Sequence, residues 1–137
     1  MTTHQIELSD PKNSVKILSG FLSEVLEGEL VPFEVDNAMQ LAGEEAIVNI
    51  FKHGYKGSEG PVIVKCTIEH GRVTLIIQDE APFFNPLSLP PPDVDAALED
   101  RKIGGLGVYL IRSLMDDVRY EQTEKGNCLI MEKAYSS

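Results

Sequence analysis

The stretch VIVKCTIEHGRVTLIIQ, residues 62–78, decides the fold class of this chain. It contains two runs rich in β-branched residues, Val62 to Glu69 and Arg72 to Gln78, separated by the dipeptide His70-Gly71. Short β-branched runs joined by a glycine-bearing two-residue link are typical of antiparallel strands and a tight turn. The pattern therefore predicts a β-hairpin in the middle of the chain.

Helical patterns lie on both sides of this hairpin. Apolar residues recur at spacings of three and four over about residues 13–28, and a second helical pattern runs from an N-cap at Asp36 to about His53. A third helix is expected from the glycines at 104–107 to about Met115. Further strands are expected at residues 4–8, near 118–122 and at 128–133.

This order of elements places most strands in hairpins, with the helices grouped between them. It predicts an α+β fold, a two-layer sandwich in which a mixed, mostly antiparallel sheet is covered by helices on one face, rather than a doubly wound parallel sheet. The 137 residues predict a single domain over 1–137. Residues 79–103 hold five of the eight prolines, and a long proline-rich insert inside a compact domain predicts a lid.

Composition excludes several classes of protein. The net charge of −10 would repel phosphodiester backbones, so no direct binding to nucleic acid is expected. Cys66 and Cys128 stand in apolar runs without metal-ligand spacing, which predicts two reduced core thiols. The first twenty residues hold no apolar signal segment and no run of 18 apolar residues occurs, so we expect a cytoplasmic protein without membrane contact.

The second helical pattern carries the first candidate site. Glu45 and Asn49, one turn apart, share a face opposite the main core stripe, where Leu41, Ala42 and Val48 surround them. A covered carboxylate beside an amide oxygen suits a hard cation and a proton acceptor. The alternative, that both side chains are solvated on an exposed helix face, fits this helix equally well.

Two more candidate sites follow along the chain. Asp79 ends a strand that has a buried pattern, where a carboxylate can accept a hydrogen bond from a ligand amine, although turn chemistry alone also explains an Asp there. Gly104-Gly105-Leu106-Gly107 opens a helix, with Arg101 and Lys102 just before it. Free backbone N–H groups at a glycine-rich helix start form an anion site, although such a cluster is often only a turn.

In this order the three segments resemble a known family. The segments EAIVNIFKHGY (45–55), DEAPFFNP (79–86) and GGLGVYLIRSLMD (104–116) closely resemble the three nucleotide boxes of bacterial anti-sigma factor serine/threonine kinases. Those kinases are small members of the Bergerat-fold ATPase superfamily, which includes histidine kinases and gyrase B. The resemblance implies the Bergerat ATP-binding fold over nearly the whole chain.

The resemblance also implies roles for individual residues. Asn49 would hold Mg²⁺, Glu45 would be the general base, and Asp79 would accept a hydrogen bond from the adenine amine. Gly105, Leu106 and Gly107 would bind the phosphates, with Lys102 adding a contact, and residues 83–103 would close over ATP as the lid. Ala81 belongs to the same nucleotide-binding set, but it stands where the family usually has glycine, and its methyl group would obstruct close approach to adenine or alter the hinge of the lid.

The family implies a function together with its partners. We expect an ATP-dependent serine/threonine kinase that phosphorylates an anti-anti-sigma (STAS) partner and sequesters a sigma factor. Relatives dimerise, so a homodimer is compatible with the resemblance. Ala81 motivates an alternative, a nucleotide-gated partner-switching module without phosphotransfer, and a third reading is a fold that binds no nucleotide at all.

Overall fold

The central hairpin forms as the sequence predicts. The computed structural model describes residues 1–82, 85 and 105–136. In it, β2 (Val62–Glu69) and β3 (Arg72–Asp79) pair in antiparallel register. The connecting His70 and Gly71 both have positive φ, 50° and 72°, the backbone conformation that matches the right-handed twist of two paired strands.

Three more strands extend this hairpin to a five-stranded sheet in the order β1-β2-β3-β5-β4. These strands are β1 (Thr2–Leu8), β4 (Asp117–Gln122) and β5 (Asn127–Ala134). Every strand pair in the described part of the chain is antiparallel, which confirms the expected α+β fold with a mostly antiparallel sheet. The physical reason is that two helices, not one, connect β1 to β2, so the chain reverses once more than in a parallel βαβ unit.

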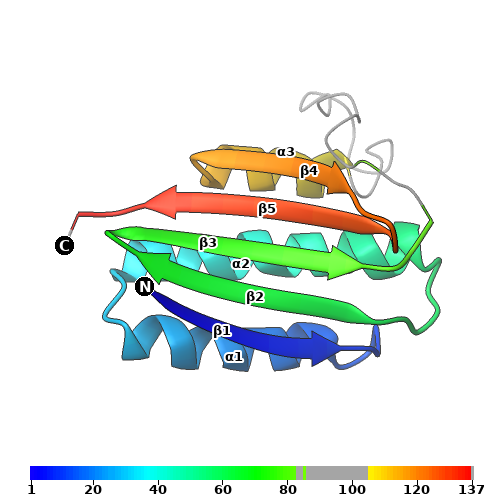
Figure 1. The fold of residues 1–137 in the computed structure, drawn as a ribbon, viewed down its shortest axis with the longest axis horizontal. Helices are drawn as coiled ribbons and strands as arrows, with labels where there is room; N and C mark the ends of the chain where they lie inside the picture. The colour runs from blue at the N-terminus through cyan, green and yellow to red at the C-terminus, as the bar shows by residue number, and fades with distance from the viewer. Residues whose placement is uncertain (83–84, 86–104, 137) are drawn as a thin grey trace.

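The helices lie on one face of the sheet, as expected for a two-layer α+β sandwich. Figure 1 shows α1 (Ser14–Gly28) behind the β1 side, α2 (Phe33–Asn49) behind the middle, and α3 (Gly105–Leu114) behind the β4–β5 side. Alternate residues of β2 and β3 point toward these helices and are fully buried, which places the core between the layers. The members of this inner row are Val62, Val64, Cys66, Val73, Leu75 and Ile77.

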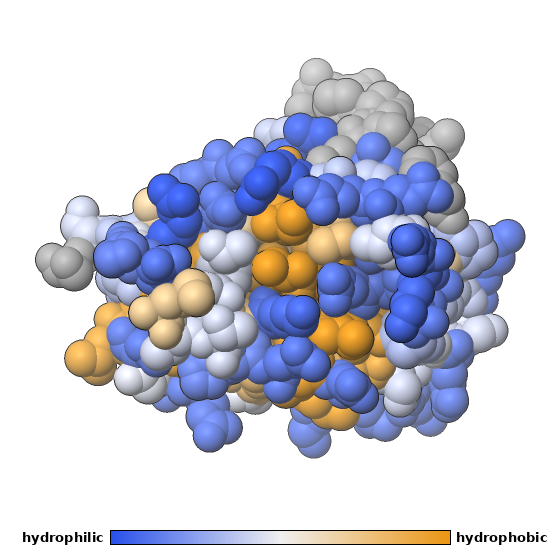
Figure 2. All heavy atoms as spheres, in the orientation of Figure 1, coloured by the Kyte–Doolittle hydropathy of each residue, from blue (hydrophilic) through white to orange (hydrophobic). Residues whose placement is uncertain are grey.

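The opposite face of the sheet meets solvent. Its central residues, including Ile63, Ile76 and Ile130, are only half-buried. Figure 2 shows this face, with hydrophobic residues in the middle and hydrophilic residues around them. The helices therefore leave one side of the sheet open (Figure 1).

The second helix differs from its expected bounds at both ends. It begins at Phe33 with Pro32 as its N-cap, so Asp36 lies inside the first turn and the predicted N-cap at Asp36 is wrong. The carbonyl of Pro32, whose φ is fixed near the helical value, accepts hydrogen bonds from the N–H groups of Val35 and Asp36. At the other end the α-helix stops at Asn49, and the chain continues as a π-helical turn, η1 (Ile50–Gly54).

The two cysteines agree with the sequence. Cys66 and Cys128 are buried free thiols, and burial raises the pKa of Cys66 to about 12. None of the helices that the structure describes has the length and apolar character needed to cross a bilayer.

Candidate functional site

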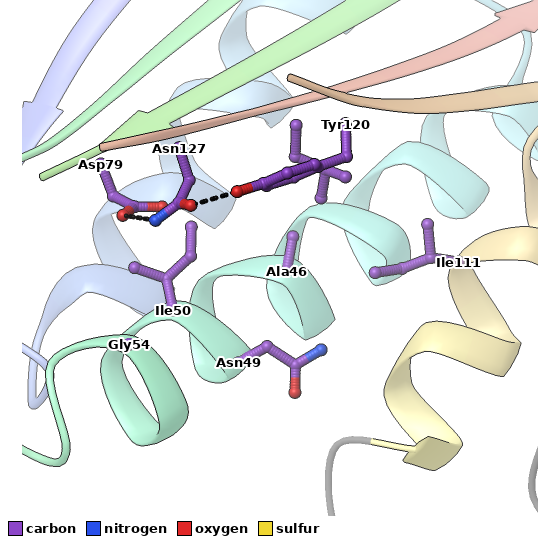
Figure 3. A pocket seen from close by; sticks show the side chains of 9 residues that line it. Ala46, Asn49, Ile50, Gly54, Asp79, Ile111, Tyr120 and Asn127 are labelled. Atoms are coloured by element: carbon purple, nitrogen blue, oxygen red, sulfur yellow. Dashed lines mark hydrogen bonds between the residues drawn. The ribbon is translucent and has the colours of Figure 1, made fainter. Parts of the chain in front are cut away.

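A cavity opens between the helical layer and the ends of β3, β4 and β5. The hollow measures about 430 Å³ when open solvent is counted, of which about 30 Å³ is space that the centre of a water molecule can reach. Side chains of α2, η1, α3 and three strands surround it, and Figure 3 shows them from close by. The lining residues are Ala46, Asn49, Ile50, Gly54, Asp79, Ile111, Tyr120, Asn127 and Leu129.

Asp79 supplies the carboxylate of this cavity. It is the last residue of β3 and only 7% exposed. Its Oδ1 accepts hydrogen bonds from the N–H of Ala81 at 2.9 Å and from Nδ2 of Asn127 at 2.8 Å. Burial raises the pKa of Asp79 and outweighs these two hydrogen bonds, which lower it. The site thus contains a buried carboxylate whose second oxygen can accept a hydrogen bond from a donor that enters the cavity.

Asn127 and Tyr120 are site residues that the sequence analysis missed. Asn127 begins β5 directly opposite Asp79, is 6% exposed, and accepts a hydrogen bond at Oδ1 from the hydroxyl of Tyr120. The only signal in the sequence is a polar residue at the start of an apolar strand, and such a residue usually belongs to the turn. The cross-strand register, rather than any local motif, brings Asn127 to Asp79.

Tyr55 is a third residue to which the sequence alone assigned no role. Its hydroxyl donates to the carbonyl of Pro61 at 2.6 Å and accepts from the N–H of Glu80 at 2.8 Å. These bonds tie the end of η1 to the start of β2 and to the residue after Asp79. Burial, more than any other effect, raises the pKa of this phenol, so the hydroxyl remains a donor at neutral pH. Tyr55 thereby fixes the backbone that carries Asp79.

Ala81 lies two residues after Asp79, and from the sequence its methyl group was expected to obstruct adenine or to alter the hinge of the lid. It is 3% exposed, and a Cβ built on Gly54 would lie only 2.9 Å from the Ala81 Cβ. The methyl group of Ala81 therefore packs into the space left by the missing side chain of Gly54. Gly54 on η1 therefore leaves the room that the Ala81 methyl group needs.

Glu45 and Asn49 share one face of α2, as the sequence predicts. Asn49 is 6% exposed and lines the cavity on the side of α2 that faces α3 (Figure 3). Glu45 lies one turn earlier and is half-buried; burial, and then the charge of Glu44, raise its pKa. The apolar patch expected around this pair is covered only in part, because Ala42 is fully buried whereas Leu41 and Val48 are 39% and 38% exposed.

The glycine segment lies at the start of α3. The helix begins at Gly105, with Leu106 and Gly107 in its first turn, and it packs against α2 beside the cavity. The first N–H groups of a helix have no partner inside it and carry positive partial charge, so this end favours an anion. Lys102, and the lid segment at 83–103 apart from Asn85, lie outside the described residues.

The described residues offer a limited set of metal ligands. They hold no group of three or more His, Cys, Asp or Glu side chains placed to bind an ion. Magnesium in phosphate-transfer sites is typically held by one or two protein oxygens and completes its shell with substrate phosphates and water. The amide oxygen of Asn49, with Glu45 one turn away, fits that kind of site and does not fit an all-protein metal cage.

Comparisons with known proteins agree with this geometry. A family model described as the histidine kinase-like ATPase domain matches residues 8–133. The chain is 34% identical over 106 residues to the serine-protein kinase RsbW of Listeria monocytogenes, a match that covers 74% of this chain and 67% of the relative. It is 32% identical over 99 residues to the RsbW of Bacillus mycoides, covering 69% of this chain and 61% of that protein.

Proposed function

Because the chain belongs to the histidine kinase-like ATPase domain family, we propose that it is an ATP-dependent serine/threonine protein kinase of the anti-sigma factor type. Its substrate is a small anti-anti-sigma protein of the STAS class, and in its other complex it sequesters a sigma factor in the cytoplasm. The relatives named serine-protein kinase support the reaction type. The observation that carries the proposal is one cavity lined by both a buried carboxylate, Asp79, and a buried amide, Asn49.

Asp79 selects the base. Its buried carboxylate accepts a hydrogen bond from the exocyclic amine of adenine, and it repels the carbonyl oxygen that guanine presents at the same position. A hydrogen bond to a charged group contributes about 1.5–3 kcal/mol. The apolar side chains of Ile50, Ile111 and Leu129 supply the walls of the same cavity.

Asn49 and the start of α3 bind the triphosphate. The amide oxygen of Asn49 would hold Mg²⁺, which when bound neutralises charge on the phosphates. The N–H groups at Gly105 to Gly107 donate hydrogen bonds to the phosphate oxygens at the positive end of the helix, where the absence of side chains at the two glycines allows close approach. Lys102 and a lid over 83–103 remain part of this proposal.

Glu45 is the general base. As the substrate hydroxyl oxygen forms its bond to the γ-phosphorus, the bond to the β–γ bridging oxygen breaks, ADP leaves, and the hydroxyl proton passes to the Glu45 carboxylate. The raised pKa of Glu45 makes this carboxylate a better proton acceptor than one in water. Half-burial leaves it accessible to a protein substrate.

Phosphate transfer tests this proposal. The wild-type chain and two variants, Glu45→Ala and Glu44→Ala, are incubated with γ-labelled ATP, Mg²⁺ and purified STAS proteins of the same organism. We expect labelled partner with wild type and with Glu44→Ala, whose side chain is exposed, and at least a hundredfold less with Glu45→Ala, the contribution typical of a positioned base.

Other outcomes separate the alternatives. Labelling that is equal in all three proteins removes Glu45 from the mechanism. Nucleotide-dependent capture of the partner without any labelling favours the partner-switching module. A wild-type chain that shows no thermal stabilisation by Mg·ATP contradicts nucleotide binding itself, because ligand at 100 times Kd stabilises a fold by about 2.7 kcal/mol.

A further inference from the structure

Three side chains from three strands form a line of hydrogen bonds at the carboxylate end of the cavity (Figure 3). Tyr120 of β4 donates its hydroxyl proton to Oδ1 of Asn127 on β5. Nδ2 of Asn127 in turn donates to Oδ1 of Asp79 on β3 at 2.8 Å. All three side chains line the cavity, and the line ends on the one carboxylate among them.

The chemistry of the neighbours fixes the direction of this line. Nδ2 of Asn127 faces three oxygens that accept hydrogen bonds: Oδ1 of Asp79, the carbonyl of Ala81 at 3.2 Å and the carbonyl of Pro82 at 3.3 Å. The NH₂ end of the amide has two hydrogens to share among these acceptors, whereas a reversed amide would place its oxygen against all three of them, so the amide cannot be reversed. Its oxygen must therefore point to Tyr120, whose hydroxyl has to donate.

The carboxylate of Asp79 is oriented as a result. Both hydrogen bonds that it accepts within the described residues, from Asn127 and from the N–H of Ala81, fall on Oδ1. Oδ2 is left as the acceptor for a group that enters the cavity. Without Asn127 the carboxylate would lose one of the two donors that hold it, and rotation about χ2 would become easier.

We propose that Asn127 and Tyr120 are positioning residues that set the base selectivity of the site. They hold Asp79 with one carboxylate oxygen directed at the ligand, so that the site distinguishes a purine with a 6-amino group from a purine without it. This inference rests on the proposed function, because it assumes that the cavity receives the base of a nucleotide. It assigns the selectivity for adenine to Asn127 and Tyr120 together with Asp79, rather than to Asp79 alone.

A purely structural role predicts a different behaviour. Asp79 and Asn127 are directly opposed in the β3–β5 pair, so the line of bonds could simply fasten β4 and β5 to β3. Loss of such a fastening would loosen the whole cavity and weaken every nucleotide alike. Loss of a positioning role weakens only the ligand that carries the 6-amino group.

The test compares two nucleotides on four proteins. Dissociation constants for Mg·ATP and for the Mg²⁺ complex of purine ribonucleoside triphosphate, which lacks the 6-amino group, are measured by calorimetry. The proteins are wild type, Asn127→Leu, Tyr120→Phe and the control Tyr109→Phe, which removes a hydroxyl from a residue that is 42% exposed on α3. We expect wild type and the control to prefer ATP by about 10- to 150-fold, the range for one charge-assisted hydrogen bond.

The preference for ATP is expected to fall at least fivefold in Asn127→Leu and by a smaller factor in Tyr120→Phe, while binding of the purine nucleotide stays within twofold. An unchanged preference in folded variants overturns the inference and leaves the proposed function intact. If Asn127→Leu does not fold, Tyr120→Phe decides alone, because it removes a single oxygen from a half-buried ring. A wild-type chain that binds neither nucleotide overturns the proposed function, and this inference with it.

Discussion

Replacing Asp79 by asparagine is expected to invert the base preference of the site. The asparagine oxygen can keep both hydrogen bonds that Oδ1 of Asp79 accepts, from Ala81 at 2.9 Å and from Asn127 at 2.8 Å. The asparagine NH₂ group then stands where Oδ2 stood and faces the adenine amine, donor against donor. The loss of one charge-assisted hydrogen bond, about 1.5–3 kcal/mol, raises the Kd for Mg·ATP by about 10- to 150-fold.

The same substitution favours a 6-oxo purine, because an NH₂ group donates to a carbonyl oxygen. Calorimetry with Mg·ATP and Mg·ITP on wild type, Asp79→Asn and the control Glu80→Gln, an exposed neighbour, measures both effects. We expect ATP to bind more tightly to wild type and to the control, and ITP to bind more tightly to Asp79→Asn. An Asp79→Asn protein that still prefers ATP would refute the assignment of this carboxylate to the base.

Asp79→Asn also changes the pH dependence of stability. Burial raises the pKa of Asp79 in the folded chain above its value in the unfolded chain, so the folded state binds this proton more tightly. The carboxylate therefore costs folding free energy as the pH rises through the raised pKa. The melting temperature of Asp79→Asn relative to wild type should increase from pH 4 to pH 7, and a constant difference would contradict a net cost of burying this charge.

Three further predictions concern neighbouring positions. Gly126→Ala places a Cβ against the backbone oxygen of Asp79 and should destabilise the fold by about 3 kcal/mol or more in urea unfolding. Gly20→Ala, with open space around it, should be neutral or stabilise by up to about 1 kcal/mol. Equal effects of the two substitutions would contradict the close approach of β3 and the β4–β5 turn. Gly54→Ala should lower the free energy of unfolding by about 1–3 kcal/mol, because its new methyl group meets Ala81. The double variant Gly54→Ala/Ala81→Gly should recover most of that loss in the same assay. Strictly additive effects of the two substitutions would show that the two positions do not touch. Glu44→Gln removes a charge that raises the pKa of Glu45. The acidic limb of the pH profile of phosphate transfer should therefore move to lower pH. A shift to higher pH, or no shift, would show that Glu45 is not the base that titrates.

The sequence predicts the parts of this fold that depend on local patterns. The hairpin of β2 and β3 follows from alternating β-branched residues and the His70-Gly71 turn, and the bounds of α1 follow from its apolar spacing. The early start of α2 was missed because Asp36 offers a good capping side chain, while the cap is formed by the backbone of Pro32. The π-helical turn at 50–54 leaves no local pattern of its own.

The candidate site divides in the same way. Glu45, Asn49 and Asp79 were predicted because they lie in segments that resemble known nucleotide boxes, and the structure places Asn49 and Asp79 around one cavity. Asn127 and Tyr120 were missed because the contact of Tyr120 with Asn127, and that of Asn127 with Asp79, join neighbouring strands of the sheet. A periodicity within one element does not report which residue will stand opposite another element.

A crystal structure grown with a saturating non-hydrolysable ATP analogue and Mg²⁺ tests the central claim most directly. We predict the adenine amine within hydrogen-bond distance of Oδ2 of Asp79, the metal ion on the amide oxygen of Asn49, and the phosphates at the start of α3. A nucleotide bound elsewhere, or a base whose amine faces away from Asp79, would contradict the account.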